Sequence, residues 1–200
     1  PTPRSSLGVP QGSALLLWVG RLDPVKGLED LLAAFCEVIR HRPAHLLLVG
    51  EGTQKSRIAD RIQELGIGDQ VTLCGIRNDI ECLLKACDIF VFPSYTEGMP
   101  NALLEAMAAG VLPLCNYHAG LKDVVDEVST VAPELAELMK LDRSRFVHEL
   151  PDRICGALEF LYPKGFAEHE HRLSVAKTLR EIAVERFSWD GIAVRLLNPT

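Results

Sequence analysis

The sequence has 200 residues, of which 48% are hydrophobic and 24% charged, and its 21 basic and 27 acidic side chains give a formal net charge of −6. This composition predicts a folded domain with a sizeable apolar core and excludes a low-complexity disordered chain. The acidic balance argues against general binding of nucleic acid, which depends on basic surface. No apolar run approaches the roughly 18 to 20 residues needed to cross a bilayer.

A segment containing several prolines and serines, residues 1–13, opens the sequence and has no charged-then-apolar signal pattern. We expect it to be a linker that follows a missing N-terminal domain. Residues 14–187 are expected to form one folded domain, and residues 188–200 a C-terminal tail helix.

Short, continuous apolar runs alternate with amphipathic stretches along the first two thirds of the chain. Runs that end in Gly, Pro or Asn are typical of strands buried on both faces, and here they cover residues 15–19, 46–49, 71–73, 89–92 and 111–115. Apolar residues at helical spacing lie between them, in residues 28–39, 58–65 and 80–87. Five successive β-α units predict an α/β fold with a doubly wound, Rossmann-like parallel sheet.

Beyond Pro133 the pattern becomes helical, in residues 150–161 and 166–187, with no second sheet. The six cysteines include no Cys-x-x-Cys pair, so we interpret them as reduced structural residues of a cytoplasmic protein. His169 and His171 are two residues apart on a predicted helix and point to different faces, which argues against a shared metal ion. No metal site is expected.

The carboxyl ends of the strands are the expected ligand site, because doubly wound sheets bind ligands there. Gly20, Gly50 and Gly75 each follow a predicted strand and allow a bulky ligand to approach the backbone, although a single glycine can also just end a strand. The segment from Gly50 to Gly52 lacks the third glycine of a dinucleotide fingerprint, and no P-loop occurs. A nicotinamide dehydrogenase and a P-loop nucleotidase are therefore disfavoured.

Two cations flank the turn after the first strand. Arg21 offers a planar fork of donors and Lys26 a mobile point charge, which together suit a diphosphate. Asp23 and Pro24 shape the turn, and Gly27 lets the next helix start close by. Two solvated loop cations would be the plain alternative for this pair.

Residues 94–110 are the most specific segment. Pro100 and Gly110 fit the two ends of a helix whose other residues are apolar on nearly every face except at Glu105. The pattern predicts a helix buried all round, in which a lone carboxylate needs a partner such as a ligand hydroxyl. Glu97 precedes the free N–H groups of this helix, where an anion and a neutral polyol could both be bound.

Five motifs in order and spacing resemble the donor-binding half of the retaining GT-B glycosyltransferases of the family 4 type (glycosyl transferases group 1). They are Gly20-Arg21-x4-Lys26-Gly27, Leu48-Val-Gly-Glu-Gly52, Val71-x2-Cys-Gly75, Ala86-x-Asp88-x-Phe90-Val-Phe-Pro93-Ser94 and Glu97-x7-Glu105-Ala-x-Ala-x-Gly110. The C-terminal Arg186-Phe-Ser-Trp189 is similar to the start of that family's closing helix. The resemblance covers residues 14–125 and implies one Rossmann-like half of a GT-B fold.

The resemblance implies that Arg21 and Lys26 bind the donor diphosphate and, with Glu97, form the catalytic set. Glu97 would receive the transferred sugar, and Glu105 the ribose hydroxyls. Arg77 would border the base and favours uridine. The further substrate-binding positions implied are Gly20, Gly98, Met99, Asn101 and Ala102.

Two local departures from the family pattern occur. The usual Gly-Gly loop reads His118-Ala119-Gly120 here, and the glycines that follow it are missing from Val128-Ser-Thr-Val131. His118 is either a donor contact or a surface histidine.

A larger departure is that no acceptor-binding half is present. The resemblance implies that residues 14–187 bind a nucleotide diphosphosugar, a UDP-sugar being favoured, for retaining transfer of a hexose to an acceptor held by an N-terminal domain of the same full-length chain, as in polysaccharide biosynthesis. No Asp-x-Asp occurs, so no metal and no cofactor are expected. Peripheral membrane contact would come only through the missing half. A non-catalytic nucleotide-sugar-binding module and a GT-B-like sugar epimerase are the alternatives.

Overall fold

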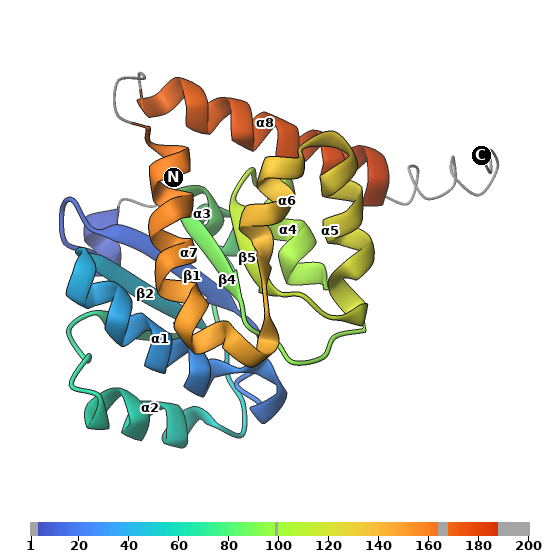
Figure 1. Cartoon of the computed structure of the whole chain (residues 1–200). Helices are drawn as coiled ribbons and strands as arrows, with labels where there is room; N and C mark the ends of the chain where they lie inside the picture. The colour runs from blue at the N-terminus through green and yellow to red at the C-terminus, as the bar shows by residue number, and fades with distance from the viewer. Residues whose placement is uncertain (1–3, 99, 164–167, 188–200) are drawn as a thin grey trace.

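Six parallel strands form one sheet in the computed structural model, which describes residues 4–98, 100–163 and 168–187 (Figure 1). Their spatial order is β3-β2-β1-β4-β5-β6. The strands are β1 (Ala14–Val19), β2 (Ala44–Val49), β3 (Val71–Gly75), β4 (Ile89–Phe92), β5 (Leu112–Asn116) and β6 (Lys140–Leu141). The predicted Rossmann-like parallel sheet and its five strands are confirmed. The sixth strand, β6, was not predicted and pairs with the end of β5.

Helices connect consecutive strands as the apolar spacing predicts, and others precede the first strand or follow the last one. In chain order, the described helices are η1 (Arg4–Leu7), η2 (Pro24–Lys26), α1 (Leu28–His41), α2 (Lys55–Glu64), α3 (Ile80–Ala86), α4 (Asn101–Ala108), α5 (Ala119–Val131), α6 (Pro133–Met139), η3 (Arg143–Arg145), α7 (Phe146–Leu161) and α8 (Glu168–Phe187). The segment 128–131, where the family pattern has glycines, lies in the last turn of α5. The predicted tail helix, residues 188–200, lies outside the described residues. No described helix is long and apolar enough to cross a membrane.

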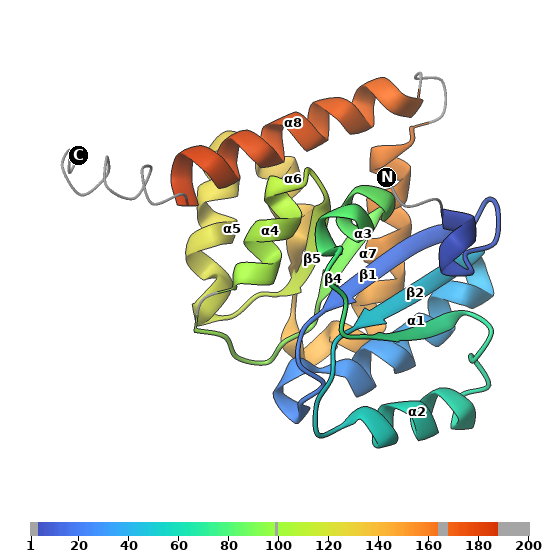
Figure 2. The same ribbon diagram turned by 180° about the vertical axis from the view of Figure 1, so that it is seen from behind.

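The sheet is covered on both faces, which explains its apolar strands. Helices α1 and α7 pack side by side on one face (Figure 1), and α3 and α4 lie on the other (Figure 2). Residues Leu15 to Trp18 of β1 are completely buried, as are Phe35 of α1 and Phe90 of β4. Each such side chain contributes about 1.5 to 3 kcal/mol on transfer from water.

The cysteines fit a structural role. All six are free thiols. Burial raises the pKa of the Cys115 thiol to about 12 and also raises that of Cys87, so both remain protonated. These two residues therefore act as small apolar core residues.

A buried carboxylate, Asp88, joins distant parts of the chain at the amino edge of the sheet. Its Oδ1 accepts hydrogen bonds from Arg4 Nη2 and from the Tyr162 hydroxyl, both at 2.6 Å, and its Oδ2 accepts one from the Leu15 N–H at 2.8 Å. Arg172 of α8 lies 3.8 Å away. Residues from the segment expected to be a linker thus pack on the domain.

The strand order reverses between β1 and β4, since the chain winds outward from β1 to β3 and then from β4 to β6 on the other side. The carboxyl ends of β1 and β4 meet at this switch point, which is the usual ligand site of such sheets. The candidate residues Gly20, Arg21 and Lys26 come from the first loop, and Glu97 comes from the second.

Candidate donor-binding site

The loops after β1 and β4 pack against each other at the carboxyl edge. Pro24 begins η2, where its fixed φ suits a helical start. Gly27 ends η2 with φ 66°, and a Cβ atom there would lie 2.3 Å from the carbonyl oxygen of Pro93. The N–H of Tyr95 also donates to the carbonyl oxygen of Val25 at 2.8 Å. The two loops therefore form one continuous surface.

Lys26 and Glu97 form an ion pair on this surface. Lys26 Nζ donates to Glu97 Oε1 at 2.7 Å, and the two side chains are only 21% and 11% exposed. The start of α5 supports Glu97 from the other side, because a Cβ atom on Gly120 would lie 2.3 Å from the Glu97 carbonyl oxygen. An ammonium group has three donors and this pair uses one, so Lys26 can bind an anion without releasing Glu97.

Arg21 lies apart from this pair and faces Asp23. Its side chain is 82% exposed, and its Nε donates to Asp23 Oδ2 at 2.8 Å. The guanidinium holds the pKa of Asp23 below its usual range. The other carboxylate oxygen accepts from Thr53 Oγ1 at 3.2 Å. A diphosphate bound by Arg21 would therefore compete with the Asp23 carboxylate.

Helix α4 is not buried all round, which corrects the sequence-based interpretation. Leu103, Ala106 and Met107 are buried, whereas Glu105 and Ala108 are exposed. The error arose because alanine is apolar in a sequence pattern yet is tolerated at the surface of a helix. Glu105 is thus a solvent-facing carboxylate, and it has no hydrogen-bond or ion-pair partner among the described residues.

Glu105 opens onto a groove of about 590 Å³ between α3, α4 and α8. Ile80 and Leu84 of α3 line it, together with the cations Lys85 and Arg180. Glu81, which pairs with Lys85, also lines this groove. Glu105 therefore lies exposed at an open groove, and its role as a ribose ligand stays a prediction.

Arg77 lies in the loop after the edge strand β3, three strands away from β4, whose loop carries Glu97. It makes a bidentate pair with Asp79, with Nε to Oδ1 at 2.8 Å and Nη2 to Oδ2 at 2.6 Å, and this pair lowers the pKa of Asp79. Its neighbour Ile76 is 75% exposed. This loop therefore presents an exposed apolar side chain beside a guanidinium that is already paired.

The amino end of α4 carries the remaining candidates. Gly98 and Asn101 are exposed and Ala102 is partly buried, while Met99 lies outside the described residues. Pro100 stands directly before the helix, and its carbonyl oxygen accepts from Leu103 and Leu104, so the N–H groups of Asn101 and Ala102 begin the helix. Such N–H groups are suited to an anion.

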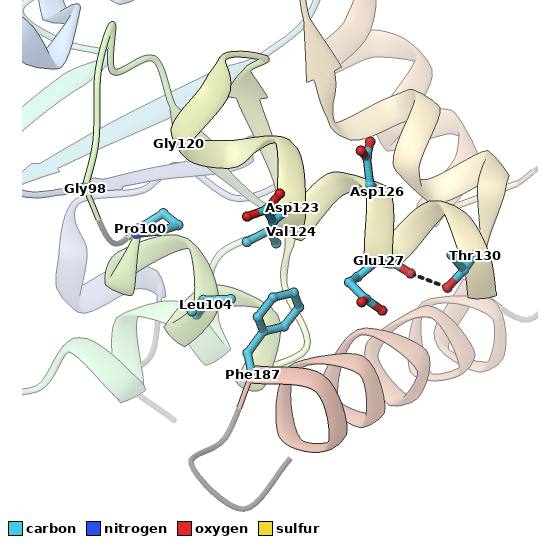
Figure 3. Close-up of a pocket in the computed structure, with 10 residues that line it drawn as sticks. All are labelled: Gly98, Pro100, Leu104, Gly120, Asp123, Val124, Asp126, Glu127, Thr130 and Phe187. Carbon is cyan, nitrogen blue, oxygen red and sulfur yellow. Dashed lines mark hydrogen bonds between the residues drawn. The ribbon is translucent and has the colours of Figure 1, made fainter. Parts of the chain in front are cut away.

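An acidic cleft of about 510 Å³ separates α4 from α5 (Figure 3). Its acidic residues are Asp123, Asp126 and Glu127, and the ring of Phe187 lies at one end. Asp126 pairs with Lys122 at 2.7 Å and Glu127 with Arg186 at 3.8 Å, so part of this negative charge is compensated. With Asp123 added, the cleft is less suited to an anion than the surface beside Lys26. Among the described residues, no group of three or more His, Cys, Asp or Glu side chains could hold a metal ion.

The glycines at the strand ends serve mainly to let neighbouring loops approach each other. A Cβ atom on Gly50, at φ 140°, would lie 1.8 Å from the Gly20 carbonyl oxygen, and one on Gly52 would lie 2.5 Å from the Leu22 carbonyl oxygen. The expectation that they admit a ligand overlooked these contacts, because a sequence does not show which backbone lies opposite. A ligand role for Gly20 stays a prediction.

Three side chains near the pair were not predicted as site residues. Asn116, fully buried at the end of β5, donates from Nδ2 to the Pro93 carbonyl oxygen at 2.6 Å and so holds the β4 loop. The Tyr95 hydroxyl donates to Asp30 Oδ2 at 2.6 Å. An Asn at the end of an apolar strand is a usable sequence signal, whereas the pairing of residues 30 and 95 has none.

His118 precedes α5 and caps it. Its Nδ1 accepts from the Gly120 N–H at 3.2 Å, which satisfies one of the free N–H groups at the helix start. The role that the structure shows for His118 is therefore that of the N-cap of α5.

Comparisons with known proteins show the family and the fold. An uncharacterized glycosyltransferase from Methanocaldococcus jannaschii is 28% identical over 198 residues, which cover 98% of this chain and 46% of that protein. The sucrose-phosphate synthase of Thermosynechococcus elongatus superposes with a TM-score of 0.74 at 28% identity, over 96% of this chain and 46% of that one. Anabaena HepE, in complex with UDP and glucose, superposes with a TM-score of 0.73 at 21% identity, over 97% and 49%.

The chain spans less than half the length of the curated relatives it matches. Its fold is a Rossmann-like half of a GT-B glycosyltransferase. The sequence model described as "Glycosyl transferases group 1" matches residues 1–137, most of the strand-and-loop frame that carries the candidate site. The chain therefore belongs to the family of glycosyl transferases group 1.

Proposed function

We propose that this chain binds a nucleotide diphosphosugar, with a UDP-sugar as the favoured donor. In the full-length enzyme the hexose would be transferred, with retention at the anomeric carbon, to an acceptor held by an N-terminal domain. The half-length match to relatives supports a second half of this kind. The bound UDP and glucose of Anabaena HepE support the choice of donor.

The Lys26–Glu97 pair is the observation that carries this proposal. A cation and a carboxylate are in contact here at the switch point of the sheet, next to the amino end of α4. The cation would bind the diphosphate and the carboxylate the sugar. A donor needs both functions within one phosphate-to-sugar distance, and charge-assisted hydrogen bonds supply both.

The chemistry follows from the charges on this surface. As the bond to the sugar breaks, negative charge grows on the departing diphosphate. Lys26, Arg21 and the N–H groups that begin α4 are fixed donors that would stabilise this charge more strongly than they stabilise the ground state. With two cations available, we propose that no divalent metal is required.

The nucleoside would lie beyond the diphosphate, over the loop after β3 and the groove beside α4. Glu105 would accept hydrogen bonds from the ribose hydroxyls. Ile76 offers an exposed apolar surface for the base, and Arg77 lies next to it.

Calorimetric titration of the chain with UDP tests the proposal. Each charge-assisted contact contributes about 1.5 to 3 kcal/mol before screening, so Arg21→Ala combined with Lys26→Ala should abolish measurable binding. The matched control, Arg57→Ala with Arg61→Ala, removes two cations from exposed pairs on α2 and should bind UDP as the parent does. Equal affinity in the parent and in the Arg21/Lys26 variant would refute the assignment. A loss of binding in EDTA that magnesium restores would refute metal independence.

A further inference from the structure

We propose that Tyr95 and Asp30 are positioning residues that hold Lys26 and Glu97 in their paired geometry for the donor. The benefit for donor binding rests on the proposed function. The positioning of the ion pair by Tyr95 and Asp30 can be tested without any ligand.

Tyr95 connects to the Lys26 loop on both sides of that lysine. Its backbone N–H donates to the carbonyl oxygen of Val25 at 2.8 Å, one residue before Lys26. Its hydroxyl donates to Asp30 Oδ2 at 2.6 Å, in the first turn of α1 and four residues after Lys26. Tyr95 itself stands two residues before Glu97. One residue, through its backbone N–H and its hydroxyl, therefore links the segment that carries Glu97 to both sides of Lys26.

The turn that carries Lys26 is short. η2 has three residues, and Asp23 before it makes no side-chain capping bond. Gly27 follows with φ 66°. Glycine has more backbone freedom in the unfolded chain than any other residue, so its ordering costs more free energy. Lysine also has a long side chain with about 2 kcal/mol of rotamer entropy. Without an external clamp, the donor would have to order this loop as it binds, which lowers affinity.

The hydroxyl of Tyr95 is the part of the clamp that a substitution can remove cleanly. A hydrogen bond from a phenol to a carboxylate is stronger than one between neutral groups. Tyr95→Phe keeps the ring and the backbone bond to Val25 and removes the hydroxyl's bond to Asp30. The hydrogen bond from the β4 loop to the segment after Lys26 is then lost, while the bond before Lys26 remains.

The chain contains a matched control in Tyr117. Its hydroxyl donates to Asp126 Oδ1 at 3.1 Å, so it makes the same kind of tyrosine–aspartate bond. It lies at the end of β5 and bonds α5, not the loop that carries Lys26. Tyr117→Phe should therefore cost a similar hydrogen bond without affecting the ion pair.

The ligand-free test is a double-mutant cycle on the ion pair. Urea unfolding of the parent, Lys26→Met, Glu97→Gln and the double variant gives the coupling between the two side chains. The same four proteins are then made with Tyr95→Phe and with Tyr117→Phe. We expect the coupling, expressed as a ratio of unfolding constants, to fall by at least about half with Tyr95→Phe and to stay unchanged with Tyr117→Phe. An unchanged coupling in the Tyr95→Phe set overturns the proposal.

Titration with UDP measures what the clamp does for binding. Tyr95→Phe should raise the dissociation constant about three- to ten-fold. Asp30→Leu should do the same, and Asp30→Asn, which keeps an oxygen acceptor, should restore most of the affinity. Asp30→Leu replaces Tyr95→Phe in the cycle if the latter does not fold. A parent chain that binds neither UDP, GDP nor ADP refutes the proposed function, while the coupling still decides whether Tyr95 and Asp30 position the pair.

Discussion

Glu97 and Glu105 belong to one sequence motif but have different surroundings. Glu97 is nearly buried and paired with Lys26, whereas Glu105 faces a solvent-filled groove. If Lys26 binds the phosphate as proposed, the carboxylate in contact with it would meet the sugar attached to that phosphate. An exposed carboxylate on a neighbouring helix face suits the ribose, which is common to the sugar donor and to the free diphosphate.

This difference predicts opposite results for two similar substitutions. Glu105→Gln should weaken UDP and UDP-glucose alike, by about ten-fold. The substitution removes a charged hydrogen-bond acceptor for the ribose, which both ligands contain. Glu97→Gln should weaken UDP-glucose but not UDP, because the free diphosphate lacks the sugar hydroxyls that Glu97 would bind and Lys26 keeps its donors for the phosphate. Calorimetry with both ligands decides this. If Glu97→Gln weakens UDP as much as UDP-glucose, Glu97 is not a sugar ligand.

At the scale of elements, the loops at the carboxyl edge depend on glycines that meet another backbone. Gly50 is opposite Gly20, and Gly120 is opposite Glu97. The loops at the carboxyl ends of the strands are therefore stacked directly on one another, with backbone against backbone at these glycines. Such contacts cannot relax by a rotamer change, since the neighbouring atoms are carbonyl oxygens.

Alanine substitution at these positions should be costly. Gly50→Ala introduces a Cβ atom 1.8 Å from a carbonyl oxygen at a φ of 140°, so we expect a loss of more than about 3 kcal/mol or a chain that does not fold. Gly156→Ala, in the interior of α7 with nothing within 4 Å, should instead stabilise by about 0.5 to 1 kcal/mol. Urea denaturation measures both. A Gly50→Ala chain as stable as the parent would contradict the stacked arrangement.

The elements that the sequence predicted well are those with long periodic patterns. The five strands were predicted from continuous apolar runs, and helices such as α1 have enough residues for their helical period to be recognised. β6 has two residues, Lys140 and Leu141, and is a strand only because the end of β5 lies beside it. The exposed face of α4 was missed for a related reason, since alanines do not reveal which side of a helix meets solvent.

The candidate site was predictable in its residue types but not in its pairings. Lys26 and Glu97 were singled out separately, and only the fold shows that they touch. Arg21 was grouped with Lys26 because they are close in sequence, yet its nearest partner is Asp23. Pairings such as Tyr95 with Asp30 span 65 residues and depend on strand order, which no local pattern encodes.

At the scale of the whole molecule, the two ends of the parallel strands have different roles. The carboxyl edge carries the candidate site, and the amino edge carries the Asp88 cluster with Arg4, Tyr162 and Arg172. Asp88 is 5% exposed, so its charge is compensated by these groups and by the Leu15 N–H. The cluster joins the first described residues to the last two helices.

Removal of this charge should affect the whole domain. Asp88→Asn leaves Arg4 and Arg172 without their carboxylate and should cost about 3 to 5 kcal/mol of the free energy of unfolding. Glu29→Gln, which breaks an exposed pair with Arg57, should leave the urea midpoint nearly unchanged. UDP affinity extrapolated to fully folded protein should be the same for both, because the cluster lies at the edge away from the site. An equal, small effect of both substitutions on the urea midpoint would show that the Asp88 carboxylate does not stabilise the domain.

The position of Arg4 in this cluster bears on where the independently folding unit starts. A fragment trimmed to the first strand, beginning at Ala14, would retain every residue of the candidate site and every strand of the sheet. It would nevertheless leave Asp88 without the guanidinium that lies 2.6 Å from it, and it would uncover the space filled by Val9, which is 6% exposed. Expression of the donor-binding half by itself should therefore succeed when the fragment begins before Arg4, and yield aggregated material when it begins at the strand.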